Sequence, residues 1–552
     1  MTSPNAEIFT IGPGAGTAGT AREMGFKAFN LARMAGIGLP VPQAFVLGTA
    51  FCRDFSKRGH KLPPHMRDLL ATEVRRLEVA SGLSFGSERR PLLVSVRSGA
   101  PVSMPGMMET LLDVGLTETS LRGMLRMSGN PRLVWDSYAR LVQSFAEIVH
   151  HCEAAAFDAV LQRHLQNAGV DRRQELDYRS LTQLTRDLLA LFETLTGKKF
   201  PEDPMDQLEA AVHAVFESWH GAKAKEYRRQ NKLDDDLGTA VTVQRMVFGN
   251  SGGTSGAGVA FTRDPATGEN VLYMDFLFNS QGEDVVSGRR ALADPIRLDE
   301  ALPDVFHQLQ DARRALEAEF QDAQELEFTV QDGRFFLLQT RAAKRTPLAA
   351  LRIAVEQVRE GQLEPAAALE QLKGFRIDDI EEVRLGATNG ARMLCRADSA
   401  SIGVASGAIA LDSAAATAAA AAGKDVILVR EETSTDDVAG FAVARGFLTA
   451  LGGRTSHAAV VARQLNKVCL VGCRDLSIDL ARRRCSIAGE WLAEGDVICL
   501  DGHGGQVFAG SPQFVTEKPA IYLAEVAKWR KNLVKRGKSA VSTLAGAVTK
   551  RA

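Results

Sequence analysis

Apolar residues follow two different periodicities along the chain. In the first third, short apolar runs alternate with turn residues, and the run Leu92 to Val96 predicts a buried strand. A loop containing prolines and glycines follows over Gly99 to Gly106. From about Asn130 to Trp219, apolar residues recur at helical spacing instead. The pattern therefore predicts a strand-containing region that is followed by a helical one.

Strand-like runs return after the helical region. Alternating and continuous apolar stretches predict strands, and the dipeptide Asp332-Gly333 predicts the turn of a hairpin. The predicted strands are Thr239 to Val247, Gly258 to Thr262, Val271 to Phe278, and the two hairpin strands, Leu326 to Val330 and Arg334 to Gln339.

The last part of the chain differs from the rest in its residue composition and in its pattern of apolar runs. Thr346 to Glu382 is rich in Ala, Leu, Glu and Gln, which predicts a helical connector. Gly403 to Gly510 contains several short apolar runs and an Ala-rich stretch, which predicts a second domain. From Pro519 onward the chain is basic and is predicted to be helical before it becomes rich in Gly, Ser and Ala.

Length and composition limit the classes of protein to consider. The 552 residues suggest three or four folding units at roughly 150 residues each. The 66 Lys and Arg against 67 Asp and Glu leave a net charge of −1, which favours neither nucleic acid nor an anionic membrane as a partner. No apolar run approaches the length of about 18 residues that spans a bilayer. The N-terminal stretch lacks the features of a secretory signal, and seven scattered cysteines favour a reducing compartment, so we expect a cytoplasmic protein.

The strongest local signal for chemistry is a glycine turn followed by a histidine. In Gly452 to Arg463 (GGRTSHAAVVAR), the glycines permit a tight turn, and Thr455 or Ser456 is suited to cap the helix that follows. His457 would begin that helix, where free N–H groups and the dipole favour an attached anion such as a phosphoryl group. A neutral imidazole is a competent nucleophile near pH 7. A helix-capping loop with a merely polar histidine is the alternative.

Three further clusters have the chemistry of a nucleotide site. The loop Gly249 to Gly258 is rich in small residues, so its N–H groups can approach phosphates, although it lacks the lysine of a Walker A motif. Glu327 and Gln339 carry oxygen ligands suited to Mg²⁺ on the predicted hairpin. Arg97 follows the strand at Leu92 to Val96 and is a candidate anion ligand, as is Arg341 beside the hairpin. Each cluster taken alone also fits an ordinary surface loop or a solvated hairpin.

Taken together and in this order, the clusters resemble the pyruvate phosphate dikinase family of PEP-utilising enzymes. The similarity runs from about Gly25 to Gly510. It rests on the segments Gly36 to Pro42, Ser95 to Leu112 (SVRSGAPVSMPGMMETLL), Val243 to Arg263 (VQRMVFGNSGGTSGAGVAFTR), Gln281 to Val286, Glu327 to Thr346 (EFTVQDGRFFLLQTRAAKRT) and Gly452 to Cys473.

The resemblance implies an α/β multidomain fold, with an ATP-grasp-like nucleotide-binding domain followed by a swivelling α/β phosphohistidine domain. We expect the nucleotide-binding region over residues 1–345, with a helical insert at about 130–235, and a helical linker over 346–388. The phosphohistidine domain would occupy 389–511, and 512–552 would be a basic helical tail. In the family, a TIM barrel that binds phosphoenolpyruvate and pyruvate begins at the position of this tail. The barrel is missing from this chain, so we expect a separate subunit to supply the acceptor site.

The resemblance also implies a division of labour among the candidate residues. ATP would pyrophosphorylate His457, inorganic phosphate would take the outer phosphoryl group, and the remaining phosphohistidine would swing to pyruvate and form phosphoenolpyruvate. Thr455 matches a position that a regulatory kinase modifies in some members. The metal ligands for Mg²⁺ would be Glu327 and Gln339. The residues implied to bind ATP are Lys27, Arg97, Thr254, Ser255, Gly256, Gly258, Glu283 and Arg341.

Several positions depart from the family pattern, and other functions stay open. The family's Gly-Gly-Lys-Gly is Gly25-Phe26-Lys27-Ala28 here, Gly253 replaces an expected acidic residue, and Arg454 replaces an expected methionine. Alternative functions are a dikinase for another acceptor (water, an antibiotic or a glucan) and a non-catalytic nucleotide-binding regulatory subunit. A fragment of a longer protein and a homo-oligomer are also open.

Overall fold

The computed structural model describes residues 8–13, 19–102, 104, 108–282, 285, 297–386, 391–433 and 437–533. The chain divides into two compact units. Unit 1 comprises Met1–Gly256 and Thr329–Thr340, and unit 2 comprises Ala257–Phe328 and Arg341–Ala552. Among the helices in the described ranges, none is long and apolar enough to cross a membrane.

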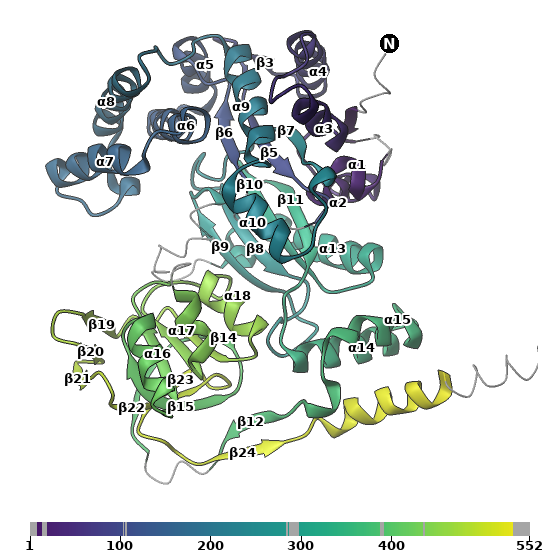
Figure 1. Cartoon of the computed structure of the whole chain (residues 1–552), viewed down its shortest axis with the longest axis vertical. Helices are drawn as coiled ribbons and strands as arrows, with labels where there is room; N and C mark the ends of the chain where they lie inside the picture. Colours follow the sequence, from purple (N-terminus) through teal and green to yellow (C-terminus); the bar gives the residue numbers. More distant parts are fainter. Residues whose placement is uncertain are drawn as a thin grey trace, which may run out of the picture. The chain divides into compact units, whose positions relative to one another are not determined.

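Unit 1 is built on a five-stranded antiparallel sheet with the order β1-β2-β7-β5-β6 (Figure 1). The central strands are buried along almost their whole length, as expected for apolar runs covered on both faces. The strands are β1 (Ile8–Ile11), β2 (Ala44–Leu47), β5 (Val94–Gly99), β6 (Thr110–Val114) and β7 (Ala240–Arg245), and a short separate pair is β3 (Ser84–Phe85) with β4 (Pro91–Leu92).

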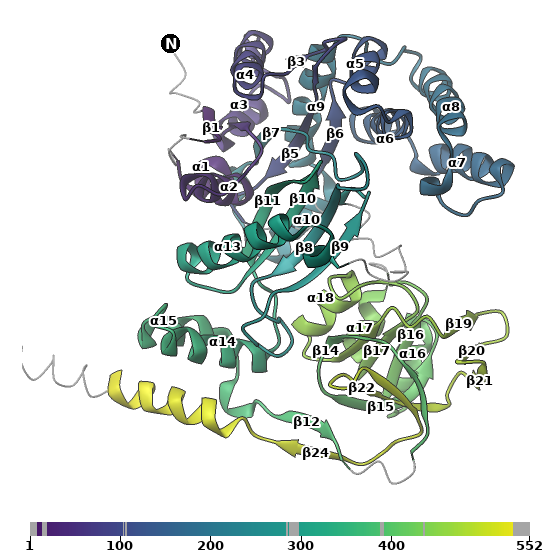
Figure 2. The same ribbon diagram turned by 180° about the vertical axis from the view of Figure 1, so that it is seen from behind.

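Helices surround this sheet and form the predicted helical region. Figures 1 and 2 both show α6, α7 and α8 gathered at one end of unit 1. Their apolar faces join the sheet in one core that includes Phe145, Phe192 and Trp219. The helices are α1 (Ala21–Met24), α2 (Phe26–Gly36), α3 (Thr49–Lys57), α4 (Met66–Ser81), α5 (Glu118–Ser128), α6 (Pro131–His150), α7 (Ala154–Ala168), α8 (Tyr178–Thr196), α9 (Pro204–Ser218) and α10 (Ala222–Gln230).

A second sheet has four strands in the order β11-β10-β8-β9. They are β8 (Gly256–Phe261), β9 (Tyr273–Phe278), β10 (Gln324–Gln331) and β11 (Arg334–Ala342), and α12 (Leu298–Ala301) and α13 (Pro303–Phe320) precede β10. The hairpin predicted around Asp332-Gly333 is confirmed, with both turn residues at positive φ. The predicted strand from Val271 begins two residues later, at Tyr273.

The second domain, predicted from its short apolar runs and Ala-rich stretch, contains an eight-stranded sheet. The strand order is β13-β23-β22-β15-β16-β17-β18-β14. Strands β15 to β18 run parallel, and the helices α16, α17 and α18 connect them. The elements are β13 (Met393–Arg396), β14 (Asp398–Ser401), β15 (Val404–Ala410), α16 (Ser413–Ala421), β16 (Val426–Arg430), α17 (Val438–Val443), β17 (Gly446–Thr449), α18 (His457–Gln464), β18 (Val468–Val471), β22 (Val497–Asp501) and β23 (Gln506–Ala509).

The remaining elements of unit 2 flank this sheet in the sequence. The connector is helical at α14 (Pro347–Arg359) and α15 (Pro365–Gln371) and ends in β12 (Glu382–Leu385), which pairs with β24 (Phe514–Glu517). A three-stranded sheet is formed by β19 (Leu476–Asp479), β20 (Arg484–Ile487) and β21 (Glu490–Ala493). The described part of the tail is helical over 520–533. The domain boundaries expected at 345, 388 and 511 stay a prediction.

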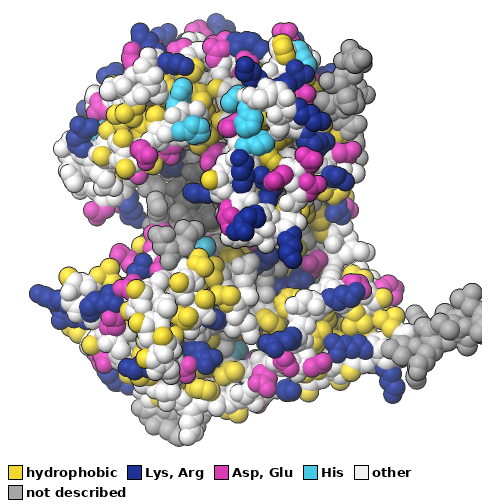
Figure 3. All heavy atoms as spheres, in the orientation of Figure 1, with side chains coloured by type: hydrophobic (Ala, Val, Ile, Leu, Met, Phe, Trp, Pro, Cys, Tyr) yellow, Lys and Arg dark blue, Asp and Glu magenta, His cyan; other side chains and the backbone are white. Residues whose placement is uncertain are grey.

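On the face drawn in Figure 3, positive and negative side chains are interspersed. A surface that binds nucleic acid would concentrate Lys and Arg in one patch. The arrangement agrees with the balanced charge of the sequence.

Candidate functional site

His457 is the first residue of α18 and lies beyond the carboxyl end of β17. The turn before it requires glycine, because Gly452 has a φ of 103° and a Cβ there would lie 3.2 Å from the Ser456 Oγ atom. Ser456 is the N-cap residue, yet its side chain makes no capping hydrogen bond. The N–H groups of the first turn therefore have no side-chain cap from Ser456, and an uncapped helix start favours an anion.

The surroundings of the imidazole favour its neutral form. Phe441 contacts the ring edge-on, with 5.9 Å between the centroids. Partial burial lowers the pKa of His457 below its ordinary value of 6.5, and the charge of Asp437 acts in the opposite direction. Asp437 is itself buried and paired with Arg430 at 3.2 Å. Near pH 7 the ring therefore keeps a lone pair available for nucleophilic attack.

Thr455 is buried, and its partner is a residue that sequence reasoning missed. Its backbone N–H and its Oγ1 hydroxyl both donate to the Oδ2 atom of Asp275, at 2.8 and 2.9 Å. Asp275 lies on β9, about 180 positions earlier in the chain. A signal for Asp275 was present, because it is the only charged residue in the strand Tyr273–Phe278.

The glycine-rich loop before β8 is fixed by the hairpin turn within unit 1. Thr254 is exposed, and its carbonyl accepts a hydrogen bond from the Gly333 N–H. Ser255 is buried; its hydroxyl accepts from the Asp332 N–H at 2.9 Å and contacts the Asp332 carboxylate at 3.4 Å. Gly253 and Thr254 are thus the exposed tip of the loop, whereas the Ser255 hydroxyl is engaged in holding it.

Two other predicted loop residues are buried strand residues of β8. Gly256 begins the strand, and Gly258 lies against Phe328. A Cβ on Gly258 would lie 2.4 Å from the Phe328 ring and 2.9 Å from the backbone oxygen of Asp275. Packing within the sheet therefore explains why position 258 is glycine. Direct contact of either residue with a nucleotide stays a prediction.

Lys27 is exposed in the first turn of α2, and this turn is seated on the end of β5. The Phe26 N–H donates to the Ala100 carbonyl at 2.8 Å. Gly25 has a φ of 77°, and a Cβ there would lie 1.9 Å from the Gly99 carbonyl oxygen. The clash explains why position 25, before this lysine, must be glycine. This packing places the helix turn that carries Lys27 against the end of the strand that carries Arg97.

Arg97 is half-buried on β5, and the structure joins it to a predicted metal ligand. Its guanidinium donates to the side-chain oxygen of Gln339 at 3.3 Å and to that of Gln244 at 3.5 Å. Gln339 lies on β11 and is buried. The arginine predicted to bind phosphate and the amide predicted to bind Mg²⁺ therefore meet within hydrogen-bond distance.

Arg341 follows two residues after Gln339 on β11, so strand alternation puts both on one face. It donates to the Oε1 atom of Glu325 at 2.5 Å. Burial works to lower the pKa of Arg341, but the bond to Glu325 and the charges of Glu325 and Glu327 raise it overall. Glu325 is a buried carboxylate that sequence reasoning missed, because Glu325 and Glu327 look alike on an alternating strand. The predicted phosphate clamp Arg341 is thus already paired.

The oxygen donors on the hairpin have the chemistry that Mg²⁺ prefers. Glu327 offers a carboxylate on β10, and Gln339 offers an amide oxygen on the neighbouring strand β11. Among the described residues, no group of three or more His, Cys, Asp or Glu side chains is arranged to hold a metal by itself. Such a small donor set fits Mg²⁺ that is shared with nucleotide phosphates. Glu283, predicted to line the nucleotide site, lies outside the described residues.

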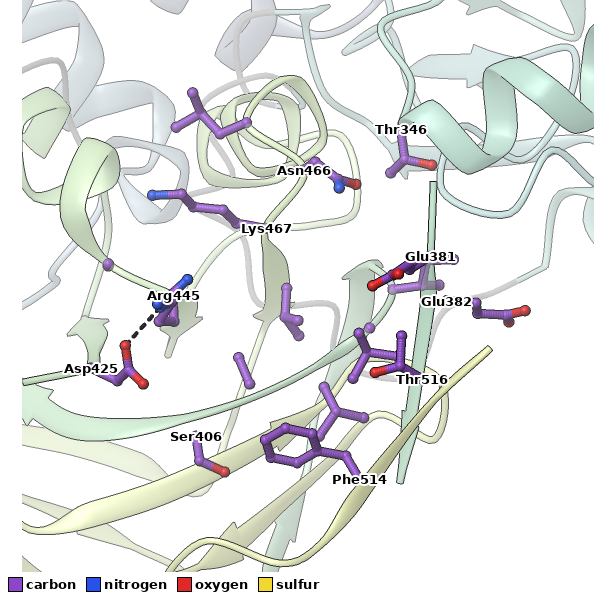
Figure 4. Close-up of a pocket in the computed structure, with 18 of the residues that line it drawn as sticks. Thr346, Glu381, Glu382, Ser406, Asp425, Arg445, Asn466, Lys467, Phe514 and Thr516 are labelled. Carbon is purple, nitrogen blue, oxygen red and sulfur yellow. Dashed lines mark hydrogen bonds and ion pairs between the residues drawn. The ribbon is translucent and has the colours of Figure 1, made fainter. Parts of the chain in front are cut away.

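A pocket of about 860 Å³ in unit 2 contains none of the predicted site residues (Figure 4). It is lined by residues at the amino ends of the parallel strands, among them Ser406, Asp425, Arg445 and Lys467. Asp425 and Arg445 form an ion pair at 2.7 Å at one side of it (Figure 4). His457 lies beyond the carboxyl end of β17, the end where ligands bind in parallel sheets. The pocket therefore lies at the opposite end of the parallel strands from His457.

Comparison with known protein families finds two matches along the chain. Residues 60–305 match the family described as "Pyruvate phosphate dikinase, AMP/ATP-binding domain". Residues 422–505, which include His457, match "PEP-utilising enzyme, mobile domain". The chain thus combines a nucleotide-binding domain with a mobile domain in a mixed α/β fold, as predicted.

Similar curated proteins are named as pyruvate, phosphate dikinases. One from Clostridium symbiosum is 40% identical over 90% of this chain and 57% of its own length. One from Entamoeba histolytica is 38% identical over 98% of this chain and 62% of its own length. A chloroplastic one from Arabidopsis thaliana is 39% identical over 91% of this chain and 52% of its own length. The chain is similar to pyruvate, phosphate dikinases, and it spans a little over half the length of these relatives.

Proposed function

We propose that this chain catalyses the ATP- and phosphate-dependent phosphorylation of His457. The observation that carries the proposal is the environment of His457. The imidazole is exposed, its pKa is lowered, and it begins a helix within the residues that match a mobile domain. These are the properties of a nucleophile that accepts a phosphoryl group and then carries it.

The proposed reaction has two steps at this histidine. In the first, an imidazole nitrogen forms a bond to the β-phosphorus of ATP, and the bond from that phosphorus to the AMP oxygen breaks, so AMP leaves with the electron pair. In the second, an oxygen of inorganic phosphate forms a bond to the outer phosphorus, and the bond from that phosphorus to the bridging oxygen breaks. The electron pair stays on the phosphoryl group bound to His457, and pyrophosphate is the released product. One phosphoryl group stays on His457. Positioned positive charge supplies most of the catalysis in such transfers.

The nucleotide would be held by residues from both sheets. Lys27 and Arg97 would contact the phosphates, and the exposed tip of the glycine loop at Thr254 would cover them. Arg341 would act as a paired cation that neutralises charge without a large rearrangement. Glu327 and Gln339 would hold Mg²⁺, which supplies neutralisation of phosphate charge when it is bound. The Arg97 contact to the Gln339 oxygen supports this grouping.

Transfer from His457 to pyruvate is the step that would follow, and we propose that a separate barrel subunit supplies this acceptor site. A compact domain on a helical connector suits such a carrier, because one histidine must serve two distant sites. Modification of the buried Thr455 hydroxyl would remove a donor to Asp275, which gives a physical reason for regulation at that residue. A cytoplasmic location stays a prediction.

Release of AMP and pyrophosphate from ATP tests the proposal without pyruvate. The purified chain with Mg²⁺ and phosphate should release both products in a single turnover, and the His457→Ala variant should release neither. The His503→Ala variant is a matched control, because His503 lies in the same unit and its ring bonds to the Val383 carbonyl. Release that survives in His457→Ala would refute the role of His457, and release of inorganic phosphate in place of pyrophosphate would favour the water-using relatives.

A further inference from the structure

Two buried thiols meet in the core of the second domain. The Sγ atoms of Cys395 and Cys473 are 3.4 Å apart, although 78 positions separate the two residues in the chain. Cys395 lies on β13 and is 5% exposed, and Cys473 follows β18 and is fully buried. Both are free thiols, and a bond between them requires the two sulfur atoms to approach by only about 1.4 Å.

The topology of the eight-stranded sheet explains why these distant residues meet. β13 is the strand at one end of the sheet and pairs with β23, whereas β14 is the strand at the other end and pairs with β18. Only Ala397 separates β13 from β14, so the chain passes directly from one edge of the sheet to the other. The sheet is therefore curled, and the two thiols lie where its edges come together.

The surroundings of the pair favour a thiolate at Cys473. The hydrogen bond between the thiols lowers the pKa of Cys473, and the N–H groups of Asp475 and Leu476 act in the same direction. These effects outweigh burial and the charge of Asp475, both of which raise the pKa. The thiolate is the nucleophilic form of cysteine, so Cys473 is the member of the pair that is suited to react first.

Other cysteines of the chain lack this arrangement. Burial raises the pKa of Cys469 to about 12 and that of Cys485 to about 11. Cys152 is the one cysteine that is not buried, and its pKa is raised as well. Oxidation governed by exposure alone would therefore fall on Cys152, whereas oxidation governed by pairing would fall on Cys395 and Cys473.

A small oxidant has a route to the pair at the edge of the sheet. Among the described elements, β13 has a strand partner on one side only, and this pairing is irregular between Met393 and Cys395. Met393 is 46% exposed. An edge strand with a bulge opens locally at low cost, so a molecule as small as hydrogen peroxide can reach the thiols without global unfolding.

We propose that Cys395 and Cys473 are a site of reversible oxidation, where a peroxide converts the two thiols into a disulfide. The Cys473 thiolate forms a bond to one peroxide oxygen, the O–O bond breaks, and the leaving hydroxide takes a proton and becomes water. The resulting sulfenic acid then reacts with Cys395: the Cys395 thiol loses its proton, the two sulfur atoms bond, the S–O bond breaks and a second water leaves. The thiols lose two electrons in total, and the peroxide is reduced to two waters. This inference goes beyond the proposed function and does not depend on it.

The disulfide would act on the loop that leads to His457. The Cys473 N–H donates to the Thr449 carbonyl at 2.9 Å, at the end of β17. A Cβ on the neighbouring Gly472 would lie 3.2 Å from the Gly452 carbonyl oxygen, so the two segments are in close contact. A bond from Cys473 to β13 therefore ties the base of this loop to the other edge of the sheet. In a reducing compartment, such a bond is transient and serves as a sensor of oxidation.

Disulfide mapping of the full chain tests the proposal. The chain is treated with hydrogen peroxide, its remaining thiols are alkylated in denaturant, and its unreduced peptides are identified by mass spectrometry. Cys395→Ala removes one partner, and Cys485→Ala is the matched control, because Cys485 is a fully buried thiol of the same core. Hydrogen exchange of the Cys473 amide, which bonds to Thr449, reports on the base of the loop.

We expect one pair of peptides joined through Cys395 and Cys473, about 2 Da lighter than the reduced pair, and dithiothreitol should restore both thiols. The same pair should form in Cys485→Ala and be lost in Cys395→Ala. Exchange of the Cys473 amide should slow by about tenfold or more in the oxidised chain, because the cross-link restricts local opening.

Oxidation confined to Cys152, or a disulfide that joins Cys473 to Cys485, would overturn the proposal. Unchanged exchange of the Cys473 amide in the oxidised chain would refute the effect on the loop. Mapping of the parent chain decides by itself on the disulfide, so the test survives a variant that fails to fold. No result here requires labelling of His457, so a failure of the proposed function is detected separately.

Discussion

Replacement of Gly25 by alanine should weaken ATP binding by about 100-fold, although residue 25 itself need not touch ATP. Gly25 has a φ of 77° and a ψ of 150°, a combination that essentially only glycine adopts, and the strain for alanine is about 1–3 kcal/mol. The new Cβ would lie 1.9 Å from the Gly99 carbonyl oxygen. This neighbour is backbone, so it cannot rotate away.

The displacement follows from the same geometry. An ordinary contact begins near 3.4 Å, so α2 and the end of β5 must separate by about 1.5 Å. That movement also breaks the 2.8 Å bond from the Phe26 N–H to the Ala100 carbonyl, worth about 0.5–1.5 kcal/mol. A total of about 3 kcal/mol against the seated arrangement corresponds to about 100-fold in affinity if ATP requires Lys27 and Arg97 together.

Titration calorimetry of ATP with Mg²⁺, in the His457→Ala background to prevent turnover, measures this effect. Gly38→Ala is the matched control: Gly38 has a φ of 82°, but no atom lies within 4 Å of a Cβ there. The Gly38→Ala variant should therefore carry backbone strain without a displacement of α2, and its affinity for ATP should fall less than tenfold. The reasoning is refuted if Gly25→Ala binds ATP within threefold of its parent, or if both variants lose affinity equally.

Two further predictions concern a titration and a buried ion pair. Because the pKa of His457 is lowered and the neutral ring is the nucleophile, labelling from ATP should stay near its maximum at pH 7 and fall only as the pH drops through a midpoint below 6.5; a rate profile with a midpoint above 6.5 would contradict this. Arg263 is fully buried between Glu317 at 2.9 Å and Glu360 at 2.6 Å. Arg263→Met should lower the free energy of unfolding of unit 2 by about 3–5 kcal/mol, because it leaves Glu317 buried without its cation. Urea unfolding measures this, and a change below about 1 kcal/mol would contradict it.

The sequence predicted elements well where local pattern alone decides them. The hairpin around Asp332-Gly333 is found, and the strand predicted over Gly258 to Thr262 is β8 (Gly256–Phe261), with small shifts at its ends. The predicted strand from Thr239 to Val247 is shorter, since β7 covers Ala240–Arg245. Apolar periodicity and turn chemistry act over a few residues, so they survive without knowledge of the tertiary structure.

The roles of single residues depend on contacts that no local pattern contains. Ser255 is predicted to bind ATP, and the structure adds the bond of its hydroxyl to Asp332, 77 positions away. Gly258 is predicted where the glycine-rich loop meets a strand, and the structure adds Phe328 in the space beside it. Such partners are distant in the chain, so composition and spacing cannot predict them.

Residues that sequence reasoning missed share one property, namely a carboxylate that the tertiary structure buries, as at Glu325 and Asp437, or partly buries, as at Asp275. Glu325 pairs with Arg341, Asp437 pairs with Arg430 beside the histidine, and Asp275 accepts from Thr455. On the chain each is one acidic residue among many. Burial makes them consequential, because a buried charge must be compensated by a specific partner.

Transfer of label from ATP to the protein tests the central claim most directly. The chain is incubated with Mg²⁺, phosphate and ATP labelled at the β-phosphorus, and the labelled residue is located by mass spectrometry of an acid-labile, base-stable adduct. The account predicts one labelled residue, His457, with AMP released in equal amount. Label on another residue, or ATP bound with no label transferred to His457, would contradict it.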